Sequence, residues 1–208
     1  MTDEGRVPPD PSDVDEPVDA HQPVGGPPQG WSGVDAFDAA VAEWLDRIRT
    51  PALDRFCYGL SSAADHSLLW FAVGGFRAAR RASPRIALRF GGALAFESVL
   101  TNGFIKSAFG RVRPPGHHDD PPEGPLPYGM RRPITSSFPS GHATAAFTAV
   151  TLLAADSPRS ARPFWYALAT LVAASRVYVR MHHASDVIVG AALGLALGRV
   201  IHRVLPLE

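Results

Sequence analysis

The segment SRVYVRMHHASD at residues 175–186 holds the most informative group of reactive side chains. His182 and Asp186 are four residues apart and would share one face of a helix. There the carboxylate could accept the Nδ1–H of the imidazole, fix its tautomer and leave Nε2 free. A histidine held in this way can attack phosphorus, and Arg176 can offer a planar fork to the phosphate oxygens. On spacing alone, His183 is a competing nucleophile.

A second group lies in the segment SSFPSGHAT at residues 136–144, where a proline, Ser140 and Gly141 lead into an apolar run. This pattern predicts the start of a helix, whose first N–H groups bind anions. The Ser140 hydroxyl can add a hydrogen bond, and Gly141 lets a ligand approach the backbone. His142, in the first turn, could pass a proton to an oxygen of that anion. By itself, the segment would also suit a capped helix with an incidental histidine.

A third group begins at the only lysine of the chain, Lys106. Arg113 follows seven residues later, so both cations would project from one face if a helix persisted through both. Pro114 and Pro115 would end that helix. The pair could clamp a multiply charged anion; the alternative is two ordinary bases at the boundary of a membrane.

Five mostly apolar segments must position these groups. They cover residues 60–76, 90–108, 134–155, 163–179 and 186–203. Each is close to the roughly 20 residues that a helix needs to cross hydrocarbon. In the last one, Gly190, Gly194 and Gly198 have the spacing that lets membrane helices approach closely. We therefore predict an all-α fold, a membrane-embedded bundle of about five spanning helices. Hydropathy alone leaves a buried soluble bundle as the alternative.

The placement of arginines predicts how the bundle is oriented. Clusters lie after the first, third and fifth apolar segments. They comprise Arg77, Arg80, Arg81, Arg85, Arg89, Arg159, Arg162, Arg199 and Arg203. If the chain alternates sides, the clusters share one face, which the positive-inside rule makes cytoplasmic. The three reactive groups would then converge at the opposite, extracytoplasmic face.

The N-terminal region differs from the rest in composition. Residues 1–30 have seven acids against one base, seven prolines and no aromatic residue, which predicts a disordered acidic tail. They lack the pattern of a cleavable signal peptide. Residues 31–58 predict an amphipathic surface helix, over about 35–49, and a connection, and residues 59–208 would form the bundle. Without the tail, 19 bases face 13 acids, a balance that favours anionic substrates, anionic lipid or nucleic acid. The one cysteine, Cys57, excludes an intramolecular disulfide framework.

In its three reactive groups the sequence resembles the type 2 phosphatidic acid phosphatase (PAP2) superfamily. The pattern of that family is Lys, six residues and Arg-Pro; then Pro-Ser-Gly-His; then Ser-Arg, five residues, His, three residues and Asp. The chain matches all three blocks in order, at Lys106–Pro114, Pro139–His142 and Ser175–Asp186. The resemblance covers about residues 60–205 and fits the membrane-embedded lipid phosphatase branch best.

The resemblance implies an enzyme that hydrolyses lipid phosphate or diphosphate monoesters through a phosphohistidine, at the extracytoplasmic face of the cell membrane. It implies His182 as the nucleophile in preference to His183, Asp186 as its orienting partner and His142 as the acid for the leaving group. The residues that would hold the phosphate are Lys106, Arg113, Ser140, Gly141 and Arg176. Family members work without a metal ion, so we expect no metal or cofactor, and no nucleic-acid partner.

Some questions stay open at the level of sequence. The family includes vanadium haloperoxidases, in which vanadate occupies the phosphate position, and a non-catalytic binder of anionic lipid would use the same cations. Phosphatidic acid, phosphatidylglycerol phosphate and polyprenyl diphosphates are all possible substrates, and the oligomeric state is open. The loop residues without a clear role are His117, His118, Asp119, Asp120, Arg131 and Arg132. Asp65 and His66, toward the outer end of the first apolar segment, could pack near the site, but a structural hydrogen bond is the favoured interpretation.

Overall fold

The computed structural model describes residues 32–117, 126, 133 and 135–207, and every element in that part of the chain is helical. The α-helices are α1 (Ser32–Arg47), α2 (Pro51–Ala63), α3 (Leu68–Arg80), α4 (Pro84–Ser98), α5 (Gly141–Ala155), α6 (Arg162–Tyr178) and α7 (Ala184–Val204). The prediction of an all-α fold is confirmed. The acidic tail at residues 1–30 lies outside the described residues.

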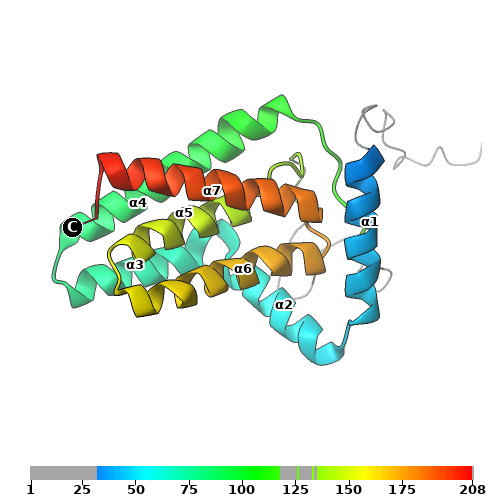
Figure 1. Ribbon diagram of the computed structural model, residues 1–208, viewed down its shortest axis with the longest axis horizontal. Coiled ribbons are helices and arrows are strands. Elements are labelled where there is room, and N and C mark those ends of the chain that lie inside the picture. Colours follow the sequence, from blue (N-terminus) through cyan, green and yellow to red (C-terminus); the bar gives the residue numbers. More distant parts are fainter. Residues whose placement is uncertain (1–31, 118–125, 127–132, 134, 208) are drawn as a thin grey trace, which may run out of the picture.

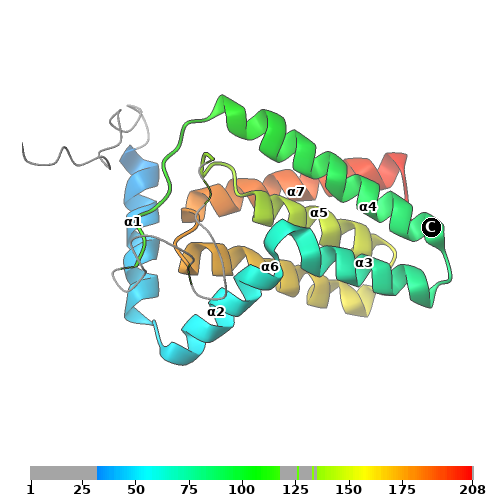
Figure 2. The ribbon, with the colours of Figure 1, turned by 180° about the vertical axis from the view of Figure 1, so that it is seen from behind.

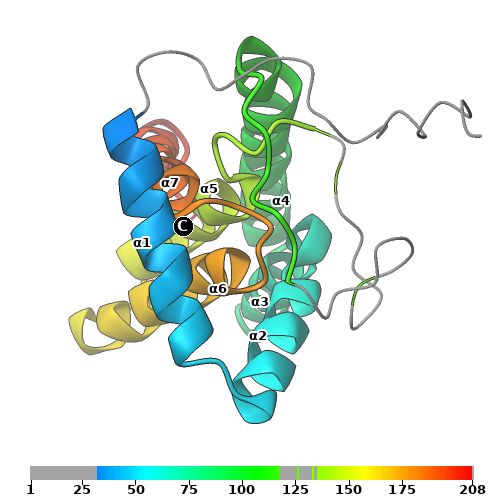
Figure 3. The same cartoon turned by 90° about the vertical axis from the view of Figure 1, so that its right-hand side faces the viewer.

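Helices α3 to α7 run along the long axis of the molecule, and α1 crosses one end of this bundle (Figures 1 and 2). The end-on view shows α1 in front of the ends of α6 and α7 (Figure 3). Proline in the first turn begins α2, α4 and α6, where its missing N–H removes no helical hydrogen bond.

The central helix is α5, which contacts α3, α4, α6 and α7. Its sequence is apolar on all sides, the pattern expected of a helix surrounded by others. Leu152 and Leu153 on α5 are fully buried and belong to the same core as Trp70 of α3 and Phe90 of α4. The start of α5 carries one of the three reactive groups, so the core holds that group in place.

Three glycines of α7 form the contact with α5. A Cβ on Gly190 would meet the Ser140 carbonyl oxygen at 2.6 Å, and a Cβ on Gly194 would clash with the carbonyl oxygen of Thr144. The backbones therefore approach each other closely, as the glycine spacing predicted. This contact fixes the position of the start of α7 relative to the start of α5.

The first predicted apolar segment, 60–76, is not one helix, and that prediction was wrong. Helix α2 ends at Ala63, a 3₁₀ turn covers Asp65–Ser67, and α3 begins at Leu68. His66 and Ser67 have φ of 52° and 60°, left-handed values that a continuous α-helix does not contain. Similarly, the segment predicted at 134–155 becomes helical only at Gly141, because Ser140 caps the helix there.

The segment predicted at 90–108 is helical to its predicted end, but it begins earlier, at Pro84, and changes its winding along its length. A π-helical turn covers Val99–Ile105 and a 3₁₀ turn covers Lys106–Ala108, so the helical stretch that begins at Pro84 changes its winding just before Lys106. Such π turns are frequent at functional sites. Among the described helices, Ala184–Val204 is long and apolar enough to cross a membrane, while Gly141–Ala155 is apolar but shorter. The number of spanning helices stays a prediction.

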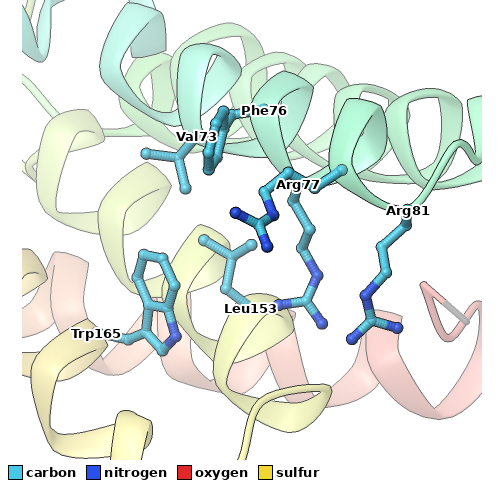
Figure 4. A pocket seen from close by; sticks show the side chains of 7 residues that line it. Val73, Phe76, Arg77, Arg81, Leu153 and Trp165 are labelled. Atoms are coloured by element: carbon cyan, nitrogen blue, oxygen red, sulfur yellow. The ribbon is translucent and has the colours of Figure 1, made fainter.

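The end of the bundle opposite α1 is basic. The α3–α4 and α5–α6 connections and the end of α7 lie there together (Figure 1), so the three arginine clusters share one end, as alternation predicted. A pocket of about 220 Å³ at this end has apolar walls that include Trp165 and Leu153, with Arg77 and Arg81 beside them (Figure 4). None of the three reactive groups contributes to its lining.

We predict that Gly194→Ala lowers the free energy of unfolding by about 1–3 kcal/mol, because the new methyl group would force the backbones of α5 and α7 apart. The matched control is Gly92→Ala on α4, where no atom lies within 4 Å of the added Cβ. That change should be neutral or stabilising by about 0.5–1 kcal/mol, since alanine is the better helix former. Thermal unfolding in detergent measures both variants; equal stability would contradict the packing described here.

Candidate active site

The three reactive groups meet at the end of the bundle that α1 crosses. The Ser140 N–H donates to the Asp186 carbonyl oxygen at 3.0 Å, which joins the start of α5 to the start of α7. The His182 N–H donates to the Arg176 carbonyl oxygen at 3.1 Å. The Arg113 guanidinium lies 3.4 Å from Nε2 of His182. Segments more than 60 residues apart in the sequence thus build one site.

Asp186 is completely buried at the start of α7, and three donors surround its carboxylate. Oδ1 accepts from Arg111 at 2.6 Å, while Oδ2 accepts from the Ser137 hydroxyl at 2.8 Å and from the His183 N–H at 2.9 Å. A buried carboxylate needs this degree of satisfaction to remain ionised. Neither Arg111 nor Ser137 was singled out by sequence analysis.

His182 lies in the connection before α7, which begins at Ala184, and so is not on a helical face with Asp186 as predicted. Its Nδ1 is 2.7 Å from the Ser137 carbonyl oxygen and 3.8 Å from Oδ2 of Asp186. The direct histidine–carboxylate hydrogen bond expected from the spacing is therefore replaced by a carbonyl. The spacing argument failed because it assumed that the helix already includes His182.

The Ser137 carbonyl also defines the tautomer of His182. A carbonyl oxygen can only accept, so the proton of a neutral ring is on Nδ1 and the lone pair on Nε2 faces Arg113. Burial lowers the pKa of this histidine to about 3, and the cation of Arg113 acts in the same direction, against the opposing effect of Asp186. At neutral pH His182 is therefore uncharged, with an available lone pair.

His183 is engaged differently. It is the N-cap residue of α7 and forms a capping box with Asp186. Its Nε2 lies 3.2 Å from the carbonyl oxygen of Val112. These contacts make His183 part of the start of the helix, and they favour His182 as the reactive histidine.

His142, in the first turn of α5, contacts Asp65, so of the two interpretations of this acid the less favoured one, a place near the site, is correct. Its Nε2 is 2.8 Å from Oδ1 of Asp65, which also accepts from Arg176 at 3.3 Å. Asp65 lies in the turn between α2 and α3, the place where the predicted first span is interrupted. The lone acid in an otherwise apolar segment was the signal that could have found it.

Lys106 and Arg113 do not share a helical face, because the helix ends at Ala108. Arg113 instead reaches the site from an extended segment, where Met181 and Ser136 carbonyls accept from its guanidinium. Lys106 is 8% exposed, and its ammonium group makes no hydrogen bond or ion pair among the described residues. It lies close enough to Arg113 and Arg176 for their charges to interact.

Arg176 and the start of α5 provide further unused donors. Arg176 is 2% exposed, and its Nε is buried without a partner in the described part of the chain. The Ser140 hydroxyl caps α5 by accepting from the Ala143 N–H, while the N–H groups of Gly141 and His142 have no acceptor among the described residues. A Cβ on Gly141 would lie 2.8 Å from the side-chain oxygen of Asn102, so packing as well as ligand access requires glycine here.

The site is thus a cluster of buried cations and free N–H groups around a histidine lone pair. The family model for the PAP2 superfamily matches residues 86–208, which include all three reactive groups. The chain belongs to the PAP2 superfamily. The predicted family is confirmed, and with it a phosphatase of the PAP2 type.

Several PAP2 relatives cover most of the chain. A decaprenylphosphoryl-5-phosphoribose phosphatase from Mycobacterium tuberculosis is 30% identical over 157 residues, which are 76% of this chain and 83% of the relative. A lipid A 4'-phosphatase from Porphyromonas gingivalis is 27% identical over 77% of this chain and 69% of the relative. The crystal structure of a transmembrane PAP2 type phosphatidylglycerolphosphate phosphatase from Bacillus subtilis matches with a TM-score of 0.64 and 25% identity, over 83% of this chain and 86% of that one.

The loop residues outside the PAP2 motifs divide into two sets. His117 is anchored to the bundle, with Nε2 2.8 Å from the Tyr178 carbonyl oxygen and Nδ1 3.7 Å from a carboxylate oxygen of Asp46. The others lie outside the described residues: His118, Asp119, Asp120, Arg131 and Arg132. Within the described ranges, no group of three or more His, Cys, Asp or Glu side chains could hold a metal ion.

We predict that Ser137→Ala reduces turnover roughly tenfold or more, because a hydrogen bond to a buried charge contributes about 1.5–3 kcal/mol. The backbone carbonyl that holds His182 is retained in this variant, so the loss reports the hydroxyl on Asp186. The matched control is Ser136→Ala, whose hydroxyl forms hydrogen bonds with the backbone of Phe138 and with no other group in the described part of the chain. Steady-state phosphate release measures both; similar rates for the two variants would contradict the assignment.

Proposed function

We propose that this PAP2 protein is an integral-membrane phosphatase that hydrolyses lipid phosphate or diphosphate monoesters through a phosphohistidine on His182, at the extracytoplasmic face. The observation that carries the proposal is the orientation of His182. The Ser137 carbonyl holds Nδ1–H at 2.7 Å, and the free Nε2 faces the guanidinium of Arg113 at 3.4 Å. A nucleophile beside a phosphate-binding cation is the arrangement that phosphoryl transfer requires.

The phosphate would bind where donors lack partners. Lys106, Arg176 and the N–H groups of Gly141 and His142 surround that position, and Arg113 adds a guanidinium next to His182. These groups are fixed by the bundle before substrate arrives, so little reorganisation accompanies the development of charge in the transition state. Ser140 contributes as the cap that holds the N–H groups in place.

In the first step, Nε2 of His182 attacks phosphorus while the bond from phosphorus to the lipid oxygen breaks. The leaving oxygen takes a proton from His142. Asp65 lies 2.8 Å from Nε2 of His142 and holds the orientation of that ring. Asp186 lies 3.8 Å from Nδ1 of His182 and stabilises the positive charge that the ring acquires.

In the second step, water attacks phosphorus and the phosphorus–nitrogen bond breaks. His142, now neutral, takes a proton from that water, and His182 leaves with its lone pair restored. Inorganic phosphate and the original protonation states result. The cycle therefore balances with the two histidines alone and leads us to expect no metal or cofactor.

The relatives support the proposed substrate class, and the arginine clusters support the proposed orientation of the bundle in the membrane. The named relatives act on lipid A, on a decaprenylphosphoryl sugar phosphate and on phosphatidylglycerol phosphate, which share a phosphate monoester on a lipid. We infer the same class for this chain. The arginine-rich end would face the cytoplasm, which puts the site at the other side of the membrane.

We predict that His182→Ala abolishes phosphate release from every substrate, since within the described residues no other histidine presents a ring nitrogen to Arg113. His142→Ala should lose about 10²–10⁴-fold on lipid phosphates, whose alkoxides leave poorly without a proton. The same variant should recover relative activity on p-nitrophenyl phosphate, because p-nitrophenolate leaves well unprotonated. Parallel assays of phosphate release on both substrates measure the difference.

Acid quenching during turnover provides the control for these variants. The wild-type enzyme should carry an acid-labile, base-stable phosphate on His182, and His182→Ala should carry none. A label on His142 or His183, or near-normal turnover by His182→Ala, would overturn the assignment.

We also predict activity that EDTA does not reduce and that vanadate inhibits. Vanadate adopts the five-coordinate geometry of the transferring phosphoryl group and should bind the same donors. Phosphate release from a lipid phosphate in detergent, with and without each compound, measures this. A loss of activity in EDTA that Mg²⁺ restores would contradict it.

A further inference from the structure

Helix α1 lies outside residues 86–208, the part of the chain that the PAP2 family model matches, yet it is joined to the catalytic carboxylate. The joining residue is Arg111. Its Nη1 donates to Asp186 at 2.6 Å, and its Nη2 donates to Asp38 of α1 at 2.7 Å. The side chains of Asp186, Asp38 and Arg111 are 0%, 3% and 12% exposed, so little water screens these charges.

Asp38 also binds the start of α7. One carboxylate oxygen accepts from the Ser185 N–H at 2.8 Å, and the other accepts from the Ser185 hydroxyl at 2.6 Å. The first N–H groups of a helix have no partner inside the helix, and a negative charge near them is stabilising. Asp38 therefore supplies from α1 a contact that the start of α7 would otherwise take from water.

We propose that Asp38 and Arg111 are positioning residues of the phosphatase, and that α1 is for this reason part of the catalytic unit. This inference rests on the proposed function. Arg111 fixes the carboxylate of Asp186 from the side opposite Ser137, and Asp38 in turn fixes Arg111. Neither residue lies among the groups that would bind the substrate phosphate.

The charges of this chain explain why Asp38 is needed. Removal of Asp38 takes away the carboxylate that lies 2.7 Å from Nη2 of Arg111, so more of the positive charge of the arginine would act on Asp186. Asp35 of α1, 3.3 Å from the same Nη2, compensates less because it is half exposed to water. Asp186 would then stabilise less of the positive charge that His182 acquires in the transition state. The expected loss is in kcat, with KM little changed, because the phosphate-binding groups are untouched.

The test uses the full-length protein in detergent and compares Asp38→Asn with Glu43→Gln. Both changes remove one negative charge from α1, but Glu43 is 71% exposed, and its ion-pair partner among the described residues is Arg47 on the same helix. Asp38→Asn should lower kcat about tenfold or more with KM within about threefold, whereas Glu43→Gln should leave both within about twofold. An unchanged kcat for Asp38→Asn, or a rise in KM that accounts for the loss, would overturn the proposal.

A double-mutant cycle separates positioning from general loosening of the fold. If Asp38 acts through Arg111, then Asp38→Asn should have little further effect on kcat in an Arg111→Gln background. Independent, multiplicative losses would overturn the proposal. If Asp38→Asn does not accumulate as folded protein, the variant Arg111→Lys is used in its place. A lysine keeps the positive charge but cannot bridge two carboxylates as a planar guanidinium does, so we expect the same loss in kcat. An unchanged kcat for Arg111→Lys would overturn the proposal.

Failure of this inference is distinguishable from failure of the proposed function. If the wild-type protein releases phosphate and forms the phosphohistidine on His182, but Asp38→Asn behaves as Glu43→Gln does, then only the positioning role of Asp38 and Arg111 is wrong. If the wild-type protein forms no phosphohistidine, the proposed function is wrong, and Asp38 and Arg111 position nothing for this reaction.

Discussion

A carboxylate without access to water is the constraint on which this structure depends. Asp186 is 0% exposed, and an unpaired charge in such a position is strongly destabilising. The donors that compensate it come from three places: Arg111 after α4, Ser137 before α5 and the backbone of His183. Satisfying one charge thus gathers the segments that also carry Arg113, His142 and His182.

Around that compensated carboxylate, the site keeps an excess of positive charge. Lys106, Arg113 and Arg176 lie close enough to repel one another, and the ammonium group of Lys106 has no hydrogen-bonding partner among the described residues. The packing of α6 against the central helix α5 holds Arg176 in place against this repulsion. A bound phosphate would relieve it, so the stability of the bundle holds the site in a state that favours an anion.

Helix α1 shows how a correct secondary-structure prediction can miss the contact that matters. The helix exists as predicted, but its closest links to the bundle are polar, through Asp38, while Phe37 and Trp44 are 45% and 56% exposed. Leu45 packs against the buried cluster that includes Tyr178 and Met181, which accounts for part of the docking. The link to the site comes from a partner in space, Arg111, which is 73 residues away from Asp38 in the sequence.

The sequence by itself determined the family, the helical class and the residues of the three motifs, because these depend on residue types at fixed short spacings. It also determined the close contact of α7, since only glycine permits it. The tertiary structure decided the roles that depend on distance. The Ser137 carbonyl, and not Asp186, is the nearest acceptor for Nδ1 of His182, and Asp65 contacts His142. Arg111 lies between Asp186 and Asp38. Spacing could not show these contacts for two reasons. Capping and burial decide where a helix begins or ends, as at Ala63, Ala108 and Ala184. Each buried charge also needs a partner, and that partner can come from any segment across the bundle.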